Sequence, residues 1–422
     1  MRKVLLVTWL LLALVAAGSA QQPAAQPTDA RRESFDIVWR TVKEKHFDPT
    51  FGGVDWDRVR QKYEPRLSQI KTDAELYDML EEMLGELHQS HFGIIPPDAI
   101  TAESREAATG GVGLDLRLID DRAVITRVDA DSPAARAGLR SGFVITKVDD
   151  LPVAQVSSRL RKAIERPAMA QLYIERRVMG HINGKPTTPV RLEYLDERDQ
   201  PHSISLVREA RKGEMSPAFA NLPPQYTEFE ARRLAGNIGY IRFNVFVMPI
   251  MPRVRAAIRE ARDAAGLIID LRGNPGGIGG LAIGMAGLLA ARQDSLGTMK
   301  MREGELKFVF SPQENAYAGK VVILVDGDSA STSEIFAAGL QELGRAVVVG
   351  ERSLGAALPS VIQKLPTGAL FQYAIADFKT PKGVLIEGRG VIPDLDVKRT
   401  RAALLAGHDA QLDAAVERIL KQ

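Results

Sequence analysis

The feature that most constrains the fold is an apolar run, a glycine turn and a helix start that follow one another around residue 330. Residues 321–325 read VVILV, residues 326–334 read DGDSASTSE and residues 335–340 read IFAAGL. The apolar run predicts a buried strand, and the residues after the turn predict a helix. Ser331 would then lie in the first helical turn, where free N–H groups and the helix dipole favour a developing oxyanion. Ser331 is therefore a candidate nucleophile, although Ser331 and Glu334 also have the spacing of a capping box, which needs no chemistry.

Composition describes an ordinary globular protein. Of 422 residues, 26% are charged and 45% are hydrophobic, which is enough for two or three domains with their own cores. The 55 Lys and Arg residues balance 53 Asp and Glu residues, so the basic excess typical of nucleic-acid binding is missing. We expect no nucleic-acid partner. His and acidic residues show no metal-ligand spacing such as His-Glu-x-x-His, and we expect neither a metal nor another cofactor.

The first 20 residues have the pattern of a secretory signal peptide. Arg2 and Lys3 precede an apolar run over residues 4–15, and small residues follow before Gln21. An uncleaved membrane anchor is the alternative, but the run is short for a full span. Residues 21–30, rich in Gln, Pro and Ala, predict a linker. The chain has no cysteine, and an exported protein without disulfides suits a bacterial periplasm, with no stable membrane insertion after signal cleavage.

A small helical domain is predicted over residues 31–108. Asp55 can cap one helix, and residues 72–75, TDAE, form a capping box that opens another. That helix carries apolar residues at helical spacing up to Leu87 and runs directly into a polar segment that contains Ser90 and His91.

Residues 109–210 change to short strands. The order of a strand over residues 111–116, a strand over 123–128, the sequence SPAARAGL over 132–139 and a further strand resembles a PDZ domain. The resemblance implies that a peptide adds as an extra strand and that backbone N–H groups of one loop hold its terminal carboxylate. The residues in the place of that loop are Gly111, Val112, Gly113 and Leu114. Residues 161–185 are longer and more charged than this pattern requires, and their structure is left open.

Strands alternate with helices over residues 211–422, which predicts an α/β core with a mainly parallel sheet and a C-terminal helix. One strand over residues 266–271 runs into a glycine-rich loop, and residues 273–277 read GNPGG. Glycines there allow backbone N–H groups to point into a site. A nucleotide loop is disfavoured because no Lys-Ser/Thr follows. An oxyanion hole accounts for the loop, and a purely structural turn is the alternative.

Four ordered motifs carry a family resemblance: DLRGNPGG at 270–277, SASTSE at 329–334, GRAVVVGE at 344–351 and EGRGVIPD at 387–394. Together with the PDZ-like region they resemble the tail-specific, or C-terminal-processing, protease family of serine peptidases. The resemblance implies a ClpP/crotonase-like core, protein or peptide substrates, and Ser331 as the nucleophile. It also implies that the backbone N–H groups of Gly277 and Thr332 stabilise the oxyanion.

One position departs from that family. Its general-base lysine follows a glycine, whereas here Gly355 is followed by Ala356, which cannot accept a proton. The pair Ser90 and His91 resembles the pair found in another branch, the tricorn-core and retinoid-binding-protein-like peptidases. The base of that branch is a His preceded by Ser. That resemblance implies His91 as the base, with Ser90 and Glu387 holding its ring.

The prediction is an exported serine endopeptidase that acts on unfolded proteins or protein C-terminal segments. A histidine base with an ordinary pKa would lose activity below about pH 6.5. Two alternatives stay open. The chain could be an inactive peptide-binding homologue that lost its base at Ala356, or another lysine, such as Lys364 or Lys382, could enter the site from a neighbouring strand. His88 competes with His91, and Glu351 or Glu334 with Glu387.

Overall fold

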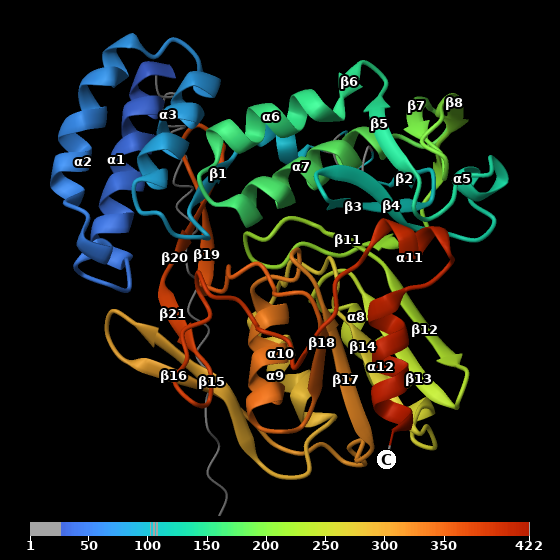
Figure 1. Ribbon diagram of the computed structural model, residues 1–422. Helices are drawn as coiled ribbons and strands as arrows, with labels where there is room; N and C mark the ends of the chain where they lie inside the picture. Colours follow the sequence, from blue (N-terminus) through green and yellow to red (C-terminus); the bar gives the residue numbers. More distant parts are fainter. Residues whose placement is uncertain (1–26, 102, 104–105, 107–108, 422) are drawn as a thin grey trace, which may run out of the picture.

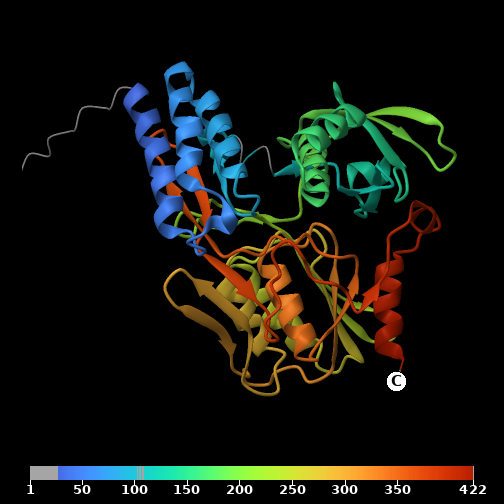
Figure 2. The same ribbon diagram turned by 60° about the vertical axis from the view of Figure 1, so that its left-hand side comes forward.

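The computed structural model describes residues 27–101, 103, 106 and 109–421, arranged as three regions (Figure 1). The helical region and the PDZ-like region lie on the same side of the layered core in both views (Figure 2). The predicted signal peptide, residues 1–20, lies outside the described residues. Helix α1 begins at Pro27, inside the predicted linker, so the helical region starts four residues earlier than expected. Within the described part of the chain, no helix is long and apolar enough to span a bilayer.

The N-terminal region packs its helices around one apolar cluster. Its elements are α1 (Pro27–Lys45), η1 (Phe51–Gly53), α2 (Trp56–Tyr63), η2 (Glu64–Gln69), α3 (Asp73–Gly85), β1 (Gly93–Ile95) and η3 (Pro97–Ile100). The predicted caps are present, because the Asp55 side chain accepts from the N–H of Arg58, and Thr72 and Glu75 form a capping box. These caps satisfy N–H groups that a helix leaves free at its start.

A hairpin from far along the sequence completes this region. Strands β19 (Ser360–Lys364) and β20 (Leu370–Ala374) pair with each other, and β20 also pairs with β1. Phe371 of β20 is fully buried in the same cluster as Phe35, Trp56 and Met79. The helical region is therefore joined to the core by a shared sheet and a shared apolar interior, and the chain is not a string of independent domains.

The PDZ-like region is a five-stranded path in the order β3-β4-β5-β7-β8, with β3 at one edge. Its elements are β2 (Gly110–Gly111), β3 (Leu114–Ile119), β4 (Arg122–Val128), α5 (Pro133–Arg136), β5 (Val144–Val148), β6 (Leu151–Pro152), α6 (Val153–Ala163), α7 (Pro167–Ile182), β7 (Pro189–Leu195), β8 (Pro201–Val207) and β9 (Glu209–Ala210). The segment that the sequence left open, residues 161–185, contains the end of α6 and all of α7. Helix α7 lies between α6 and the core (Figure 1).

The core is built on a six-stranded sheet in the order β12-β13-β14-β17-β18-β22. Its pairings are parallel except for β12 with β13, which confirms the predicted mainly parallel α/β core. Helices α8, α9 and α10 contribute to the apolar cluster on one face, and α12 to the cluster on the other. The core elements are β10 (Glu214–Met215), β11 (Tyr226–Thr227), β12 (Phe229–Leu234), β13 (Ile238–Phe243), α8 (Ile250–Glu260), β14 (Gly266–Asp270), α9 (Gly279–Gly287), β15 (Asp294–Met301), β16 (Glu305–Phe310), β17 (Lys320–Val325), α10 (Thr332–Glu342), β18 (Val347–Gly350), β21 (Ala376–Lys379), β22 (Leu395–Asp396), α11 (Arg401–Leu405) and α12 (Ala410–Leu420).

The shared interior gives a first prediction. Phe371→Ala removes a fully buried ring from the N-terminal cluster and should lower the free energy of unfolding by about 3–5 kcal/mol. Urea unfolding followed by tryptophan fluorescence measures this loss. Val361→Ala in the same hairpin is the control, because Val361 is 37% exposed and its truncation should cost about 0.5 kcal/mol. Equal losses would contradict the shared interior.

Candidate active site

Ser331 stands at the turn between β17 and α10, with φ of 55°. Positive φ is uncommon for a residue with a side chain, and such strain persists where the surroundings fix it. The fixing contacts come from the glycine-rich loop: the Ala330 N–H donates to the Asn274 carbonyl at 3.0 Å, and the Ser329 hydroxyl donates to the Leu271 carbonyl at 2.8 Å. The buried strands thus hold a half-buried serine at the carboxyl edge of the sheet.

Glu334 organises the other side of this turn. Its fully buried carboxylate accepts hydrogen bonds from the Ser331 N–H at 3.0 Å, the Ser353 hydroxyl at 2.5 Å, and the N–H groups of Gly355 at 2.7 Å and Ala356 at 3.0 Å. Burial raises the pKa of Glu334 to about 7, and the four donors oppose that rise. The carboxylate ties Ser331 to residues 353–356.

Two backbone N–H groups beside Ser331 make no hydrogen bond to any described residue: those of Gly277 and Thr332. The Gly276 carbonyl accepts from the Phe246 N–H at 2.7 Å, so the N–H of Gly277, on the other side of the same trans peptide, points away from Phe246. The Thr332 hydroxyl donates to the Gly277 carbonyl at 2.9 Å and holds the two residues together. A pair of free, preorganised donors next to a serine suits an oxyanion.

His91, Ser90 and Glu387 form a chain of hydrogen bonds, which we call the relay. The Ser90 hydroxyl donates to Glu387 Oε2 at 2.8 Å and lies 2.7 Å from His91 Nδ1. A hydroxyl has one proton, so Ser90 must accept from His91, and Nδ1 carries the ring proton. The lone pair is then on Nε2, which is the tautomer that a general base requires.

The relay and the serine meet at two adjacent residues. The Ala356 carbonyl accepts from the Ser331 N–H at 2.8 Å, and the Ala357 N–H donates to Glu387 Oε2 at 3.0 Å. The structure therefore brings the four predicted residues to one place. Among the described residues no hydrogen bond joins the His91 ring to the Ser331 hydroxyl. Such bonds are often long in enzymes without substrate.

The competing candidates lie elsewhere. Lys364 is exposed on β19, and Lys382 donates its N–H to Glu342, at the far end of α10 from Ser331. His88 is exposed, 3.7 Å from Glu165. Glu351 accepts from Gln411 of α12, on the opposite face of the sheet. None of these side chains has a hydrogen bond with Ser331 or His91 among the described residues.

The predicted carboxylate-binding loop opens on a cavity of about 860 Å³ between the PDZ-like region and the core. Gly111, Gly113 and Leu114 line it, whereas the Val112 side chain is fully buried. Farther along β3, the Leu118 N–H donates to Glu175 of α7 at 2.7 Å. Helix α7 thus occupies part of the edge of β3, the edge to which a peptide would add as an extra strand.

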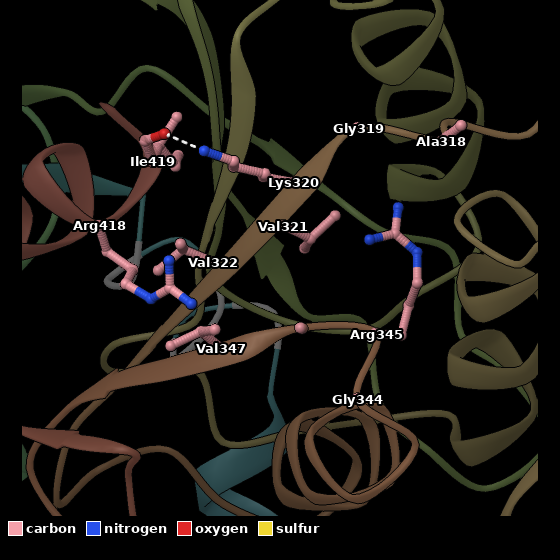
Figure 3. A pocket seen from close by; sticks show the side chains of 11 residues that line it. Ala318, Gly319, Lys320, Val321, Val322, Gly344, Arg345, Val347, Arg418 and Ile419 are labelled. Atoms are coloured by element: carbon pink, nitrogen blue, oxygen red, sulfur yellow. Dashed lines mark hydrogen bonds between the residues drawn. The ribbon is translucent and has the colours of Figure 1, made fainter. Parts of the chain in front are cut away.

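A second cavity, of about 290 Å³, lies at the opposite end of the sheet (Figure 3). Lys320, Arg345 and Arg418 are among its lining residues, and Lys320 Nζ donates to the Ile419 carbonyl at 2.8 Å. It surrounds the starts of β17 and β18, whereas Ser331 follows the end of β17. No predicted catalytic residue lines it.

Arg166 is the site residue that the sequence analysis missed. It precedes α7, and its guanidinium donates to the Gly355 carbonyl at 2.9 Å and lies 3.5 Å from Glu387 Oε1. The usable signal was Pro167, because proline in the first turn marks a helix start. That signal could have placed a helix there, but not its contact with a residue 221 positions away.

Comparisons with known proteins agree with this architecture. Residues 237–397 match peptidase family S41, residues 27–85 the tricorn protease C1 domain and residues 110–169 the PDZ domain. The chain is 28% identical over 390 residues to a carboxyl-terminal-processing protease of Synechocystis sp., covering 90% of this chain and 84% of the relative. It is 26% identical over 413 residues to putative tricorn protease homolog 2 of Streptomyces coelicolor, covering 94% of this chain and 32% of the relative.

Solved structures show the same fold. The photosystem II D1 C-terminal processing protease superposes with a TM-score of 0.57 at 23% identity, covering 90% of this chain and 98% of that chain. The tricorn protease superposes with a TM-score of 0.54 at 18% identity, covering 94% of this chain and 37% of that one. The fold and these matches define a serine-type peptidase. Residues 237–397 carry the peptidase family S41 match, in the region where the four motifs predicted it.

Gly276 gives a prediction for the oxyanion geometry. Its φ is +97°, and an added Cβ would lie 2.7 Å from both Ser331 Cβ and Thr332 N. Gly276→Ala should therefore displace the serine turn and lower kcat/KM about 10²-fold, since misplacement of reacting groups by about 1 Å has that effect. Gly280→Ala is the control because an added Cβ there meets nothing within 4 Å. Unchanged activity in Gly276→Ala would contradict this packing.

The pH profile gives another prediction and corrects the expected loss below pH 6.5. Burial lowers the pKa of His91 to about 4, so its ring stays neutral well below its ordinary range. The first loss of kcat/KM on acidification should instead fall near pH 7, where Glu334 takes up a proton and gives up an acceptor position. In Glu334→Gln, activity should be lower and constant between pH 6 and 8. A profile in that variant that still falls near pH 7 would exclude Glu334 as the cause.

Proposed function

We propose that this peptidase hydrolyses peptide bonds in unfolded proteins or protein C-terminal segments, with Ser331 as nucleophile and His91 as general base. The observation that carries the proposal is the continuous contact from His91 through Ser90 and Glu387 to Ala357, next to the residue that holds Ser331. Relatives named carboxyl-terminal-processing proteases support the substrate class.

In the proposed reaction, the Ser331 hydroxyl attacks the scissile carbonyl carbon while His91 Nε2 takes its proton. The positive ring keeps its Nδ1–H bonded to Ser90, whose hydroxyl remains bonded to the Glu387 carboxylate. The carbonyl oxygen becomes an oxyanion and accepts from the N–H groups of Gly277 and Thr332. His91 then returns the proton to the leaving amine, and water releases the acyl group by the same steps.

We also propose export, with the PDZ-like region presenting the chain end to the core. Residues 1–20 support export through their signal-peptide pattern. The cavity beside Gly111 and Gly113 supports the presenting role, because its loop offers backbone N–H groups to a terminal carboxylate. Periplasmic location in a bacterium follows if the signal is cleaved there.

Covalent labelling tests the catalytic assignment. A fluorophosphonate should modify the protein at Ser331, as mapped by mass spectrometry of the labelled peptide, and a denatured protein should be hydrolysed. His91→Ala should lower both rates by about 10⁴-fold or more, because it removes the base that activates the hydroxyl. His88→Ala, which replaces an exposed histidine three residues earlier, is the matched control and should react as the parent does.

Two outcomes of this experiment would contradict the proposed function. If the folded protein binds denatured chains but neither labels nor hydrolyses them, the inactive homologue that lost its base at Ala356 takes the place of this proposal. If His91→Ala labels at the parent rate, another base must serve Ser331.

A further inference from the structure

The segment that carries Ser90 and His91 is strained at two residues. His88 has φ of 52° and His91 has φ of 60°, and both values lie in the left-handed region. Residues with a side chain seldom adopt this conformation, and they keep it where the surrounding structure fixes it. The contacts of Ser90 with Glu387 hold the middle of the segment, so its two ends require contacts of their own.

His46 makes those contacts. It directly follows α1, and its ring is fully buried. Nε2 of the ring lies 2.9 Å from Oε1 of Gln89, the residue before Ser90. The same ring stacks on Phe92, the residue after His91, with 5.5 Å between the ring centroids and 11° between the ring planes. One side chain therefore contacts the segment on both sides of the pair that belongs to the relay.

The His46 ring is itself fixed in place. Its Nδ1 lies 3.0 Å from the backbone nitrogen of Asp48 and 2.8 Å from the carbonyl oxygen of the same residue. Phe47 stacks on the ring with 4.6 Å between centroids, and Phe51 contacts it at 5.3 Å with a tilted ring. Phe51 and Phe92 both pack against the apolar cluster of the N-terminal region. The ring therefore connects a rigid cluster to the strained segment.

The chemistry of the ring suits the contact with Gln89. Burial lowers the pKa of His46, although its hydrogen bonds oppose that change, so the ring is neutral at neutral pH. A neutral imidazole has one N–H donor, and an amide oxygen accepts, so Nε2 donates to Gln89 Oε1. In the described part of the chain, no other hydrogen bond or aromatic ring contact involves the side chain of Gln89 or Phe92.

We propose that His46 is a positioning residue, which holds the segment of Ser90 and His91 in its strained conformation through Gln89 and Phe92 and thereby fixes where the His91 ring stands. The inference rests on the proposed role of His91 as the base and adds a residue from the end of α1 to the site. No proton moves and no bond breaks at His46.

A buried histidine can also serve packing alone, and the two roles predict different results. A histidine that only packs contributes to the free energy of unfolding and leaves the rate of the folded enzyme unchanged. A positioning residue changes that rate, because His91 can leave its left-handed conformation once the neighbouring side chains are released. Displacement of a reacting group by about 1 Å lowers a rate about 10²-fold.

The test compares fluorophosphonate labelling rates at pH 8 for two changes at Gln89. Gln89→Met keeps the length of the side chain and removes the acceptor for His46, so the rate should fall about tenfold, as for a partial displacement of the base. Gln89→Glu keeps an acceptor oxygen at the same reach and should recover most of that loss. Burial lowers the pKa of His91 to about 4, so its ring is neutral at pH 8. Equal rates for Gln89→Met and the parent would overturn the proposal.

His46→Phe tests the ring directly, and Val38→Ala is its control for stability. Phenylalanine keeps a stacked ring and removes the donor to Gln89, so the labelling rate should again fall about tenfold. Val38 is fully buried in the same apolar cluster, earlier on α1, and its truncation should destabilise the fold while the folded protein labels as the parent does. An equal loss in Val38→Ala would assign the effect to stability and overturn the proposal. Gln89 is partly exposed, so its variants give the answer even where His46→Phe does not fold.

Amide hydrogen exchange gives a readout that does not depend on catalysis. The Ser90 N–H donates to Glu387 Oε1 at 3.0 Å, and in Gln89→Met it should exchange about tenfold faster, because local opening becomes easier. Amides of α3 should keep their parental rates, as measured by mass spectrometry of peptides from both segments. If the parent does not label but this local change is seen, the proposed function fails and His46 still holds the segment. If the parent labels and both exchange and labelling are unchanged in Gln89→Met, the inference alone fails.

Discussion

The buried carboxylate of Glu334 is the interaction on which the site depends. Four donors converge on it, from the nucleophile turn and from residues 353–356. Without that acceptor, the N–H groups of Gly355 and Ala356 and the Ser353 hydroxyl proton would be buried without partners, at about 1–3 kcal/mol each. The carboxylate therefore determines where the 353–356 loop lies, and Ala357 beyond that loop is where Glu387 binds. The position of the relay follows from a residue that takes no part in the proposed proton transfer.

Residues from three segments that are distant in the sequence build this one site. Ser90 and His91 follow the N-terminal helices, Arg166 belongs to the PDZ-like region, and Ser331 and Glu387 belong to the core. Each segment is fixed by its own apolar cluster, and the clusters meet through a few directed contacts, such as β1 with β20 and Leu172 with Ala356. Rigid packing of each region lets single hydrogen bonds between regions keep distances of 2.8–3.0 Å.

Local patterns predicted the elements, because strand, turn and helix signals act over a few residues. The run before Asp326 became β17, and the TDAE sequence became a capping box. The family resemblance supplied the pairing of His91 with Glu387, which no local signal contains, since 297 residues separate Ser90 from Glu387. Helix α7 was missed because its apolar residues divide between two surfaces. Ile174 and Val178 pack in the apolar cluster of the PDZ-like region, whereas Leu172 packs against the turn that carries Ser331. No single apolar stripe therefore marks the helix. The prediction of an ordinary pKa for His91 missed its lowering by burial for a similar reason, because burial depends on how the regions assemble.

Ala356 contributes to the site through its backbone and its small size. Both of its backbone groups are engaged, the N–H with Glu334 and the carbonyl with the Ser331 N–H, and these contacts do not depend on the side chain. The methyl group is 4% exposed and packs beside Leu172. A lysine ammonium in this apolar contact would need a new partner or a route to solvent. With alanine, α7 packs directly against the nucleophile turn through Leu172, and the start of the helix places Arg166 against Gly355 and Glu387. The small side chain at position 356 and the place of the arginine thus depend on one packing arrangement.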